Sequence, residues 1–431
     1  MIFSEVARHE LLQTKHVDKV MRIFAGQEMN SPLASVLPLK PINADKVVID
    51  VDLGFRGGMT PGIAIGAEHP LFGQYGSGRI EFSAVRWGEK VRISEEELVD
   101  LRRLGTLSEL QTGSEVLNRK YRDVRFRLSR RLEWMRREAL FDGQVMHPTQ
   151  DGIERVAAVY ERPDFLKFTA GTLWSNASAD PLSDLMEWSE FFKDYSDYQI
   201  NRIILPHGTL RMLTENTRFL NIATNSHMAF DGSRQSVARI MANYLGLGSI
   251  EESSAKFDFV GQLPVAVASG ATTVVIKGEF SKLEVGDVIT FKGSNRVMDQ
   301  VTVTGAPTAQ ANGTWSIPCS ATTKDLVAGT MAKFHRFVIP KDQVLMLGSP
   351  LGPMSDEGTQ VPPELADLAQ WGSVVTTYNR VNDLDRPTPG IYTKLIDKLT
   401  NHDPGHIEQL IGINALPMIE YSHAWATATI R

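Results

Sequence analysis

The sequence predicts an α+β fold that carries an all-β insertion. Three stretches support this prediction: one long helix over 114–141, alternating strands and helices over 181–260, and short β-branched runs over 261–334. The chain has 431 residues, 42% of them hydrophobic and 22% charged, so it is long enough to bury more than one core. We therefore expect two or three domains.

A glycine-rich excursion separates the first two extended runs, "KVVIDVDLGF" and "RIEFSAVRWGEKVRIS". Eight glycines lie between residues 54 and 82. A phosphate-binding loop would need a Gly-Lys-Ser/Thr signature before a helix, and the sequence holds no Gly-Lys dipeptide. The pattern therefore predicts a long two-stranded excursion and not a nucleotide site.

The strongest helical signal lies over 114–141. Apolar residues recur at steps of three and four, which makes one stripe along a helix of roughly 40 Å at about 1.5 Å per residue. They are Leu117, Tyr121, Val124, Leu128, Leu132, Met135 and Ala139. Eight arginines and Lys120 stand against four carboxylates, a local net charge of +5. Two interpretations stay open: a solvated face with pairs such as Glu133 with Arg137, and a helix that faces another subunit or DNA.

The middle of the chain reads as an α/β layer. Asp180 is expected to cap a helix that starts at Pro181 and turns Leu182, Leu185, Trp188 and Phe192 inward. The strand "NRIILP" then leads into one helix, "TLRMLTENTRFL". A further helix, "SRQSVARIMANYLGL", is expected to end at Gly246 or Gly248.

The segment 261–334 reads as a compact all-β module, because small and β-branched residues alternate in runs broken by Gly, Asn and Pro. Its flanks, "FDFVGQ" and "FVIPKDQVLMLG", are interpreted as two strands of one layer that the module interrupts. The chain closes with two further strand signals, "IEQLIGINALPMIEY" and "HAWATATI".

No chemical site stands out. The ten histidines show no metal-ligand spacing, no Gly-x-Ser-x-Gly elbow occurs, and the single cysteine, Cys319, reads as a small buried hydrophobe. No run approaches the roughly 18 apolar residues of a membrane span, and the net charge of −6 argues against a protein that coats DNA. We therefore expect a structural protein, not an enzyme, with no cofactor, no metal and no membrane partner.

The order of these elements, with "IILPHGTLRML" in the α/β layer, resembles the major capsid proteins of tailed double-stranded-DNA bacteriophages, the Hong Kong 97-type fold, in the lambda-like coat protein branch. The module with "LEVGDVITFKG" is similar to the β-barrel insertion domain of some podovirus coat proteins. The resemblance implies an N-terminal arm (1–45), an E-loop (46–93), a peripheral domain (94–180) with spine helix 114–141, an axial domain (181–260 and 335–400), an insertion domain (261–334) and C-terminal peripheral strands (401–431).

The resemblance implies a shell protein that assembles with itself into pentamers and hexamers around packaged double-stranded DNA, which it contacts non-specifically. It also implies a scaffolding protein, a portal protein and an optional decoration protein as partners, and a place in the virion after assembly in the host cytoplasm. Subunit contacts are expected at Arg56, Gly57, Gly58, Arg79, Arg125, Arg130 and Arg131. Glycine's permissive backbone would let the E-loop bend over a neighbour. No lysine lies over 53–86, so the isopeptide cross-link of the namesake phage is not expected.

The net charge suggests a shell wall that mildly repels DNA. We therefore expect most of the eight helix arginines to be neutralised by carboxylates of the same or neighbouring subunits. Three alternatives remain: an encapsulin-like nanocompartment shell, which the β insertion and the length disfavour, a DNA-binding protein that uses the Arg-rich helix, and an enzyme whose site is not evident.

Overall fold

The computed structural model describes most of the chain between residues 32 and 430. The described residues are 32–42, 46–52, 77–83, 85–94, 113–148, 154–160, 162–176, 178–196, 198–225, 233–278, 280, 282–293, 297–310, 313–350, 372–377, 391–397, 406–419 and 423–430. The chain divides into two compact units. The first unit comprises Met1–His147, Glu154–Glu252 and Asp342–Arg431, and the second comprises Pro148–Ile153 and Ser253–Lys341.

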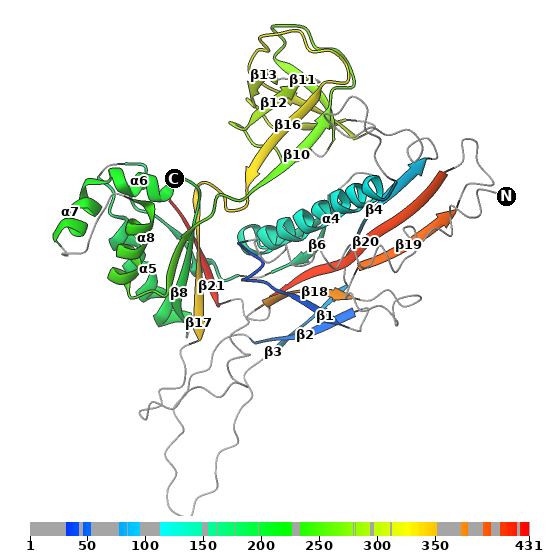
Figure 1. Ribbon diagram of the computed structural model, residues 1–431. Coiled ribbons are helices and arrows are strands. Elements are labelled where there is room, and N and C mark those ends of the chain that lie inside the picture. The colour runs from blue at the N-terminus through cyan, green and yellow to red at the C-terminus, as the bar shows by residue number, and fades with distance from the viewer. Residues whose placement is uncertain are drawn as a thin grey trace, which may run out of the picture. The chain divides into compact units, whose positions relative to one another are not determined.

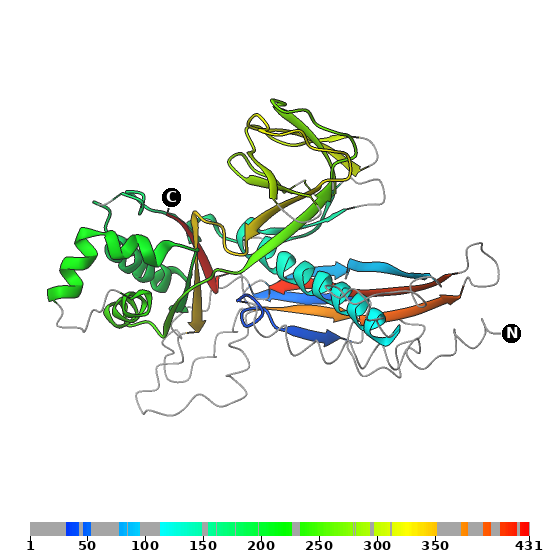
Figure 2. The same ribbon diagram turned by 45° about the horizontal axis from the view of Figure 1, so that its top comes forward.

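The first unit contains a five-stranded sheet covered by one long helix. Its path is β1 (Leu39–Ile42), β18 (Gly372–Thr377), β20 (His406–Ile419) and β19 (Ile391–Asp397), with β4 (Val85–Ser94) paired along β20. The β1–β18 pair is parallel and the other pairs are antiparallel. Helix α4 (Gly113–Arg137) lies along β4 and β20 (Figure 1, Figure 2).

Helix α4 buries the predicted apolar stripe. Tyr121, Val124, Leu128, Leu132 and Met135 are all buried, which confirms the helical periodicity for these five residues. The Tyr121 hydroxyl donates to Gln409 Oε1 of β20 at 2.6 Å, and burial raises the pKa of this phenol. A π-helical turn, η3 (Glu138–Asp142), continues the helix and ends at Gly143, whose φ of 68° is left-handed.

The last turns of this helix are enclosed on all sides. Every residue from 132 to 141 is buried, including the charged side chains of Glu133, Arg136, Arg137 and Glu138. The interpretation of a solvated charged face is therefore wrong for this half of the helix. It is tenable for the preceding turns, where Arg122 and Arg127 are exposed.

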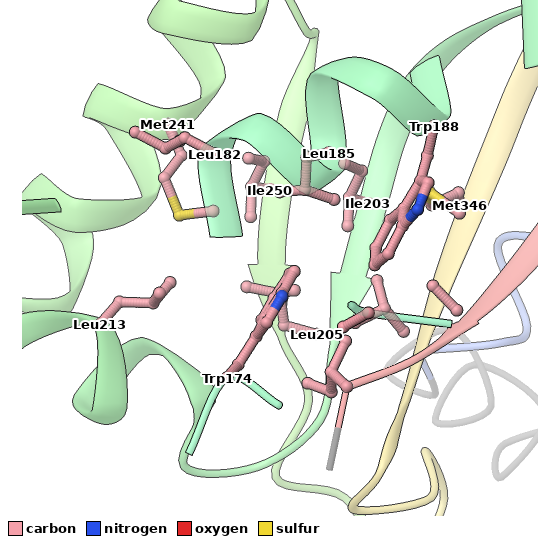
Figure 3. Close-up of a cluster of buried hydrophobic side chains, with 14 of the residues drawn as sticks. Trp174, Leu182, Leu185, Trp188, Ile203, Leu205, Leu213, Met241, Ile250 and Met346 are labelled. Atoms are coloured by element: carbon pink, nitrogen blue, oxygen red, sulfur yellow. The ribbon is translucent and has the colours of Figure 1, made fainter. Parts of the chain in front are cut away.

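A second five-stranded sheet in the first unit has the order β7 (Lys167–Thr169), β21 (Trp425–Thr429), β17 (Gln343–Pro350), β8 (Tyr198–Leu205) and β9 (Ser249–Glu252). Its helices are α5 (Pro181–Ser196), α6 (Thr209–Glu215), α7 (Thr217–Asn225) and α8 (Arg234–Leu245). Side chains of these helices and strands form one apolar core, which includes Trp174, Trp188 and Met346 (Figure 3). This sheet with its helices is the predicted α/β layer.

Helix ends in this layer follow the capping rules, and one of them was not expected. Asp180 Oδ1 accepts a hydrogen bond from the Ser183 amide at 3.4 Å, as expected for the start of α5. Gly246 ends α8 with a φ of 65°. The single helix expected over 209–220 is wrong, because Asn216 breaks it. Its side chain accepts from the Phe219 amide and donates to the Ala179 carbonyl, so Asn216 ends α6 and caps α7.

The second unit is a seven-stranded sheet with its own apolar core. The strand order is β13 (Val297–Thr302), β12 (Val288–Lys292), β16 (Met331–Phe337), β10 (Lys256–Gln262), β11 (Thr273–Gly278), β15 (Thr314–Pro318) and β14 (Thr308–Gln310). Cys319 is buried in this core together with Phe280, Phe291 and Phe334. Burial, with a smaller contribution from Asp299, raises the pKa of the Cys319 thiol.

Three assignments of strands to layers are wrong. The stretch "FDFVGQ" lies in β10, which pairs with β16 along its whole length and so belongs to the second unit. Residues 372–397 hold β18 and β19, which pair with β20 and not with the layer of β8. Strand β21 was expected to belong with β20 among the C-terminal peripheral strands, but it pairs with β17 in the other sheet. Strand pairing, which local sequence does not encode, decides these memberships.

Two short ladders complete the description. Strands β2 (Lys46–Asp52) and β3 (Ser77–Ser83) pair antiparallel, so the two extended arms of the excursion do meet as expected. Strands β5 (Gln144–Pro148) and β6 (Glu154–Val159) form the second ladder.

Replacing Asp299 by asparagine is expected to destabilise the second unit at neutral pH by roughly 1–2 kcal/mol. Burial by itself would raise the pKa of Asp299, but hydrogen bonds outweigh it and lower the pKa. They come from Thr323 Oγ1 and the Thr323 amide, both at 2.7 Å, and from the Gln300 amide at 2.9 Å. Because the pKa of Asp299 is lower in the folded than in the unfolded chain, its ionised carboxylate stabilises the fold at pH values above the unfolded-state pKa. This stabilisation is lost as the pH falls through the folded-state pKa.

Calorimetry of the full chain near neutral pH, and again in acid below the ordinary aspartate pKa of about 3.9, checks this prediction. The difference between wild type and variant is expected to shrink in acid. Asp287→Asn serves as the control, because Asp287 is a partly exposed carboxylate that accepts one backbone hydrogen bond, from the Glu284 amide at 3.0 Å. An equal loss for the two variants at neutral pH would contradict the prediction.

Candidate assembly surfaces

The glycine-rich hairpin is the first candidate surface. Of its expected contact residues, Arg56, Gly57 and Gly58 lie outside the described residues, and Arg79 lies in β3, opposite Asp50 of β2. Within the described part of the chain, β2 and β3 pair only with each other. Because an isolated two-stranded ladder is at best marginally stable in water, this hairpin is suited to packing on another surface.

The long helix is the second candidate, and the structure separates its three expected contact residues. Arg130 is exposed. Arg131 is partly buried, with its guanidinium carbon 4.6 Å from the Trp87 ring centroid of β4. Arg125 is only 3% exposed, so it lies inside the chain and does not contribute to an outer surface. The expectation of a subunit contact is therefore wrong for Arg125.

Three other helix arginines form ion pairs within the same chain. Arg127 contacts Glu89 of β4 at 3.1 Å in an exposed pair, which contributes about 0–1 kcal/mol. Arg136 pairs with Glu133 at 3.1 Å, and Arg137 pairs with Asp142 at 3.2 Å. The expected pairing of Glu133 with Arg137 is wrong, because Arg137 reaches Asp142 and stacks on Trp134, with 4.8 Å between guanidinium carbon and ring centroid.

The buried pair Glu133–Arg136 anchors the segment that precedes β1. Glu133 Oε1 accepts from the Leu33 amide at 3.0 Å, and Arg136 Nε donates to the Leu37 carbonyl at 2.9 Å. Leu33 and Leu37 are themselves fully buried. Sequence reasoning treated Glu133 as a surface residue. The surrounding stretch "LEWMRREALF" places apolar residues on every side of the helix. This pattern is the signal that could have revealed the enclosed site.

The outer side of α4 carries an apolar residue among arginines. Phe126 is 46% exposed, and Arg122 and Arg130, one helical turn before and after it, are exposed as well. Arg119 lies in the same stripe and is partly exposed. These four residues are called the α4 outer face below.

Within the described residues, no cluster of three or more His, Cys, Asp or Glu side chains could hold a metal ion. The same part of the chain has no helix long and apolar enough to cross a membrane.

The model of the family described as phage major capsid protein E matches residues 36–232, a range that includes the β2–β3 hairpin, α4 and α5 to α7. No curated protein matches the sequence. The match covers 197 of the 431 residues, and this part of the chain is similar to a family of viral shell proteins. The predicted α+β class and the predicted resemblance to phage major capsid proteins are confirmed.

Solved structures similar to this chain come from several sources. A phage-related protein from Bordetella bronchiseptica RB50 is 10% identical over 96% of this chain and 95% of its own, with a TM-score of 0.43. The capsid protein of cyanophage P-SCSP1u is 7% identical over 91% and 86%, with a TM-score of 0.41. The SrpI encapsulin of Synechococcus elongatus PCC 7942 is 9% identical over 93% and 87%, with a TM-score of 0.37.

Proposed function

We propose that this protein assembles into pentamers and hexamers that build an icosahedral head shell around phage double-stranded DNA. The match to the phage major capsid protein E family carries this proposal. The β2–β3 hairpin supports it, because a ladder without further strands in the described residues gains stability from a neighbouring subunit. Shell formation needs no catalytic turnover, so the proposal includes no enzymatic activity.

The partners in this proposal follow from the same role. The chain contacts further copies of itself, a scaffolding protein during assembly, a portal protein at one vertex and the packaged DNA without sequence preference. A decoration protein is an optional partner on the outside. The net charge of −6 fits a shell wall that does not hold the DNA tightly.

Purified full-length chain is expected to sediment as rings of five and six subunits or as closed shells, visible by negative-stain electron microscopy. A compact monomer at every concentration, with and without a scaffolding protein, would contradict the proposal. Salt-dependent binding to duplex DNA by this monomer would instead favour the DNA-binding alternative. Shells that enclose a cargo protein and exclude DNA would favour the encapsulin-like alternative.

A further inference from the structure

An exposed cluster of aromatic side chains lies where α5 meets the turn Asp164–Leu166. Phe191 and Tyr195, one helical turn apart on α5, stack with 4.4 Å between ring centroids. Phe165 lies 6.2 Å from Tyr195 and 6.5 Å from Phe191. Phe165 is 45% exposed and Tyr195 is 61% exposed. We call Phe165, Phe168, Phe191 and Tyr195 the aromatic patch.

Contacts with the buried core fix the aromatic patch in place. Phe168 meets Phe191 edge-on at 5.8 Å and stacks on the buried Trp188 at 5.7 Å, so the patch is continuous with the core of Figure 3. Large aromatic side chains fixed in place in this way lose little conformational entropy on binding. They are the residue type that most often dominates the energy of protein–protein contacts.

Carboxylates border the aromatic patch on the same face of α5. Glu187, Glu190 and Asp194 are exposed, and within the described residues none of the three takes part in an ion pair. Lys193 is the one basic residue of α5. A surface that combines exposed rings with three unpaired carboxylates is suited to a partner that is basic and apolar at once.

The α4 outer face has the complementary chemistry. It presents Arg119, Arg122 and Arg130 around the exposed ring of Phe126, with two exposed carboxylates nearby on the same helix, Glu115 and Asp123. From Arg122 to Arg130, and likewise from Glu187 to Tyr195, the helix advances eight steps, roughly 12 Å at about 1.5 Å per residue. Guanidinium groups also stack favourably on aromatic rings. The aromatic patch with its carboxylates and the α4 outer face therefore have similar lengths and opposite charges, and both expose aromatic rings.

We propose that the aromatic patch and carboxylates of α5 in one subunit pack on the α4 outer face of a second copy of this chain. This inference rests on the proposed shell function. The contact joins two different surfaces, so it is head-to-tail, and head-to-tail contacts close into rings when the rotation between subunits allows it. The contact brings exposed carboxylates of one subunit next to exposed arginines of its neighbour.

Charge reversal on each side tests this contact. The double variant Arg122→Glu/Arg130→Glu and the double variant Glu187→Arg/Glu190→Arg are each expected to lower the assembled fraction at least about tenfold, because like charges then face each other. The quadruple variant restores opposite charges and is expected to recover most of the assembly. Phe165→Ser/Tyr195→Ser is expected to impair assembly without a charge change. Sedimentation gives the assembled fraction, and circular dichroism verifies folding.

Single reversals on α6 provide matched controls. Arg211 and Glu215 are exposed and pair with each other at 3.5 Å, away from both surfaces in the sequence. Arg211→Glu and Glu215→Arg are expected to assemble like the wild type.

The outcomes separate this inference from the shell function. If the wild type stays monomeric, both the proposed shell function and the proposed contact are overturned. If the wild type assembles and the folded α4 and α5 double variants assemble equally well, only the proposed contact is overturned. A quadruple variant that assembles no better than either double variant also overturns it. An Arg122→Glu/Arg130→Glu variant that forms normal shells but packages less DNA would assign the α4 outer face to the genome and overturn the contact.

Discussion

Replacing Glu133 by alanine is expected to lower the free energy of unfolding of the first unit by about 3–5 kcal/mol. Arg136 is only 2% exposed, so the variant leaves a buried guanidinium without its carboxylate, and the Leu33 amide loses its acceptor. Thermal unfolding followed by circular dichroism measures the loss. The effect is large because water cannot replace the missing charge inside the fold.

Glu89→Ala is the matched control for this prediction. Glu89 also pairs with an arginine of α4, Arg127, but the Arg127 side chain is 68% exposed and water replaces the pair, so the loss should stay below about 1 kcal/mol. Hydrogen exchange gives a second, local readout, because the Leu33 amide should exchange faster in Glu133→Ala alone. Similar losses in both variants, with unchanged exchange at Leu33, would show that the pair does not anchor this segment.

Replacing Trp188 by alanine is expected to cost about 3–5 kcal/mol in the α/β layer. The Trp188 ring stacks with Phe168 at 5.7 Å and with Trp174 at 6.0 Å between ring centroids. Figure 3 shows Trp174 and Trp188 within the core. Removal of the Trp188 ring leaves a cavity that both neighbouring rings face. Chemical denaturation of the purified chain measures the loss through the shift of the transition midpoint.

Tyr195→Ala is the control for the Trp188 variant, because Tyr195 is 61% exposed and its removal opens no interior cavity. A loss of about 1 kcal/mol or less is expected for it. Trp188→Ala should in addition impair assembly, since Phe168 links the stack to the aromatic patch. A loss for Trp188→Ala no greater than that for Tyr195→Ala would contradict the account of a rigid aromatic core.

The candidate surfaces were only partly predictable. The sequence points to α4 as a contact helix, and Arg130 is exposed as that expectation requires. The helical spacing could also have separated Arg125 from Arg130. Arg125 follows Tyr121 by four residues and precedes Leu128 by three, so it lies on the buried apolar stripe, whereas Arg130 lies on the opposite side of the helix. The aromatic patch escaped sequence reasoning, since "EFF" and "DFL" meet only when the turn at Phe165 folds against α5.

By itself the sequence determined the α+β class, the stripe of α4, the cap of α5 at Asp180 and the all-β character around 261–334. Each of these depends on residues close together in the chain, where local geometry turns a spacing into a buried face. Tertiary structure alone decided that β21 joins β17 while β20 joins β4, and that Glu133 and Arg136 form a buried pair. Strand partners and the burial of a charge depend on segments far apart in the sequence, whose proximity is set by the packing of the whole unit and by no local pattern.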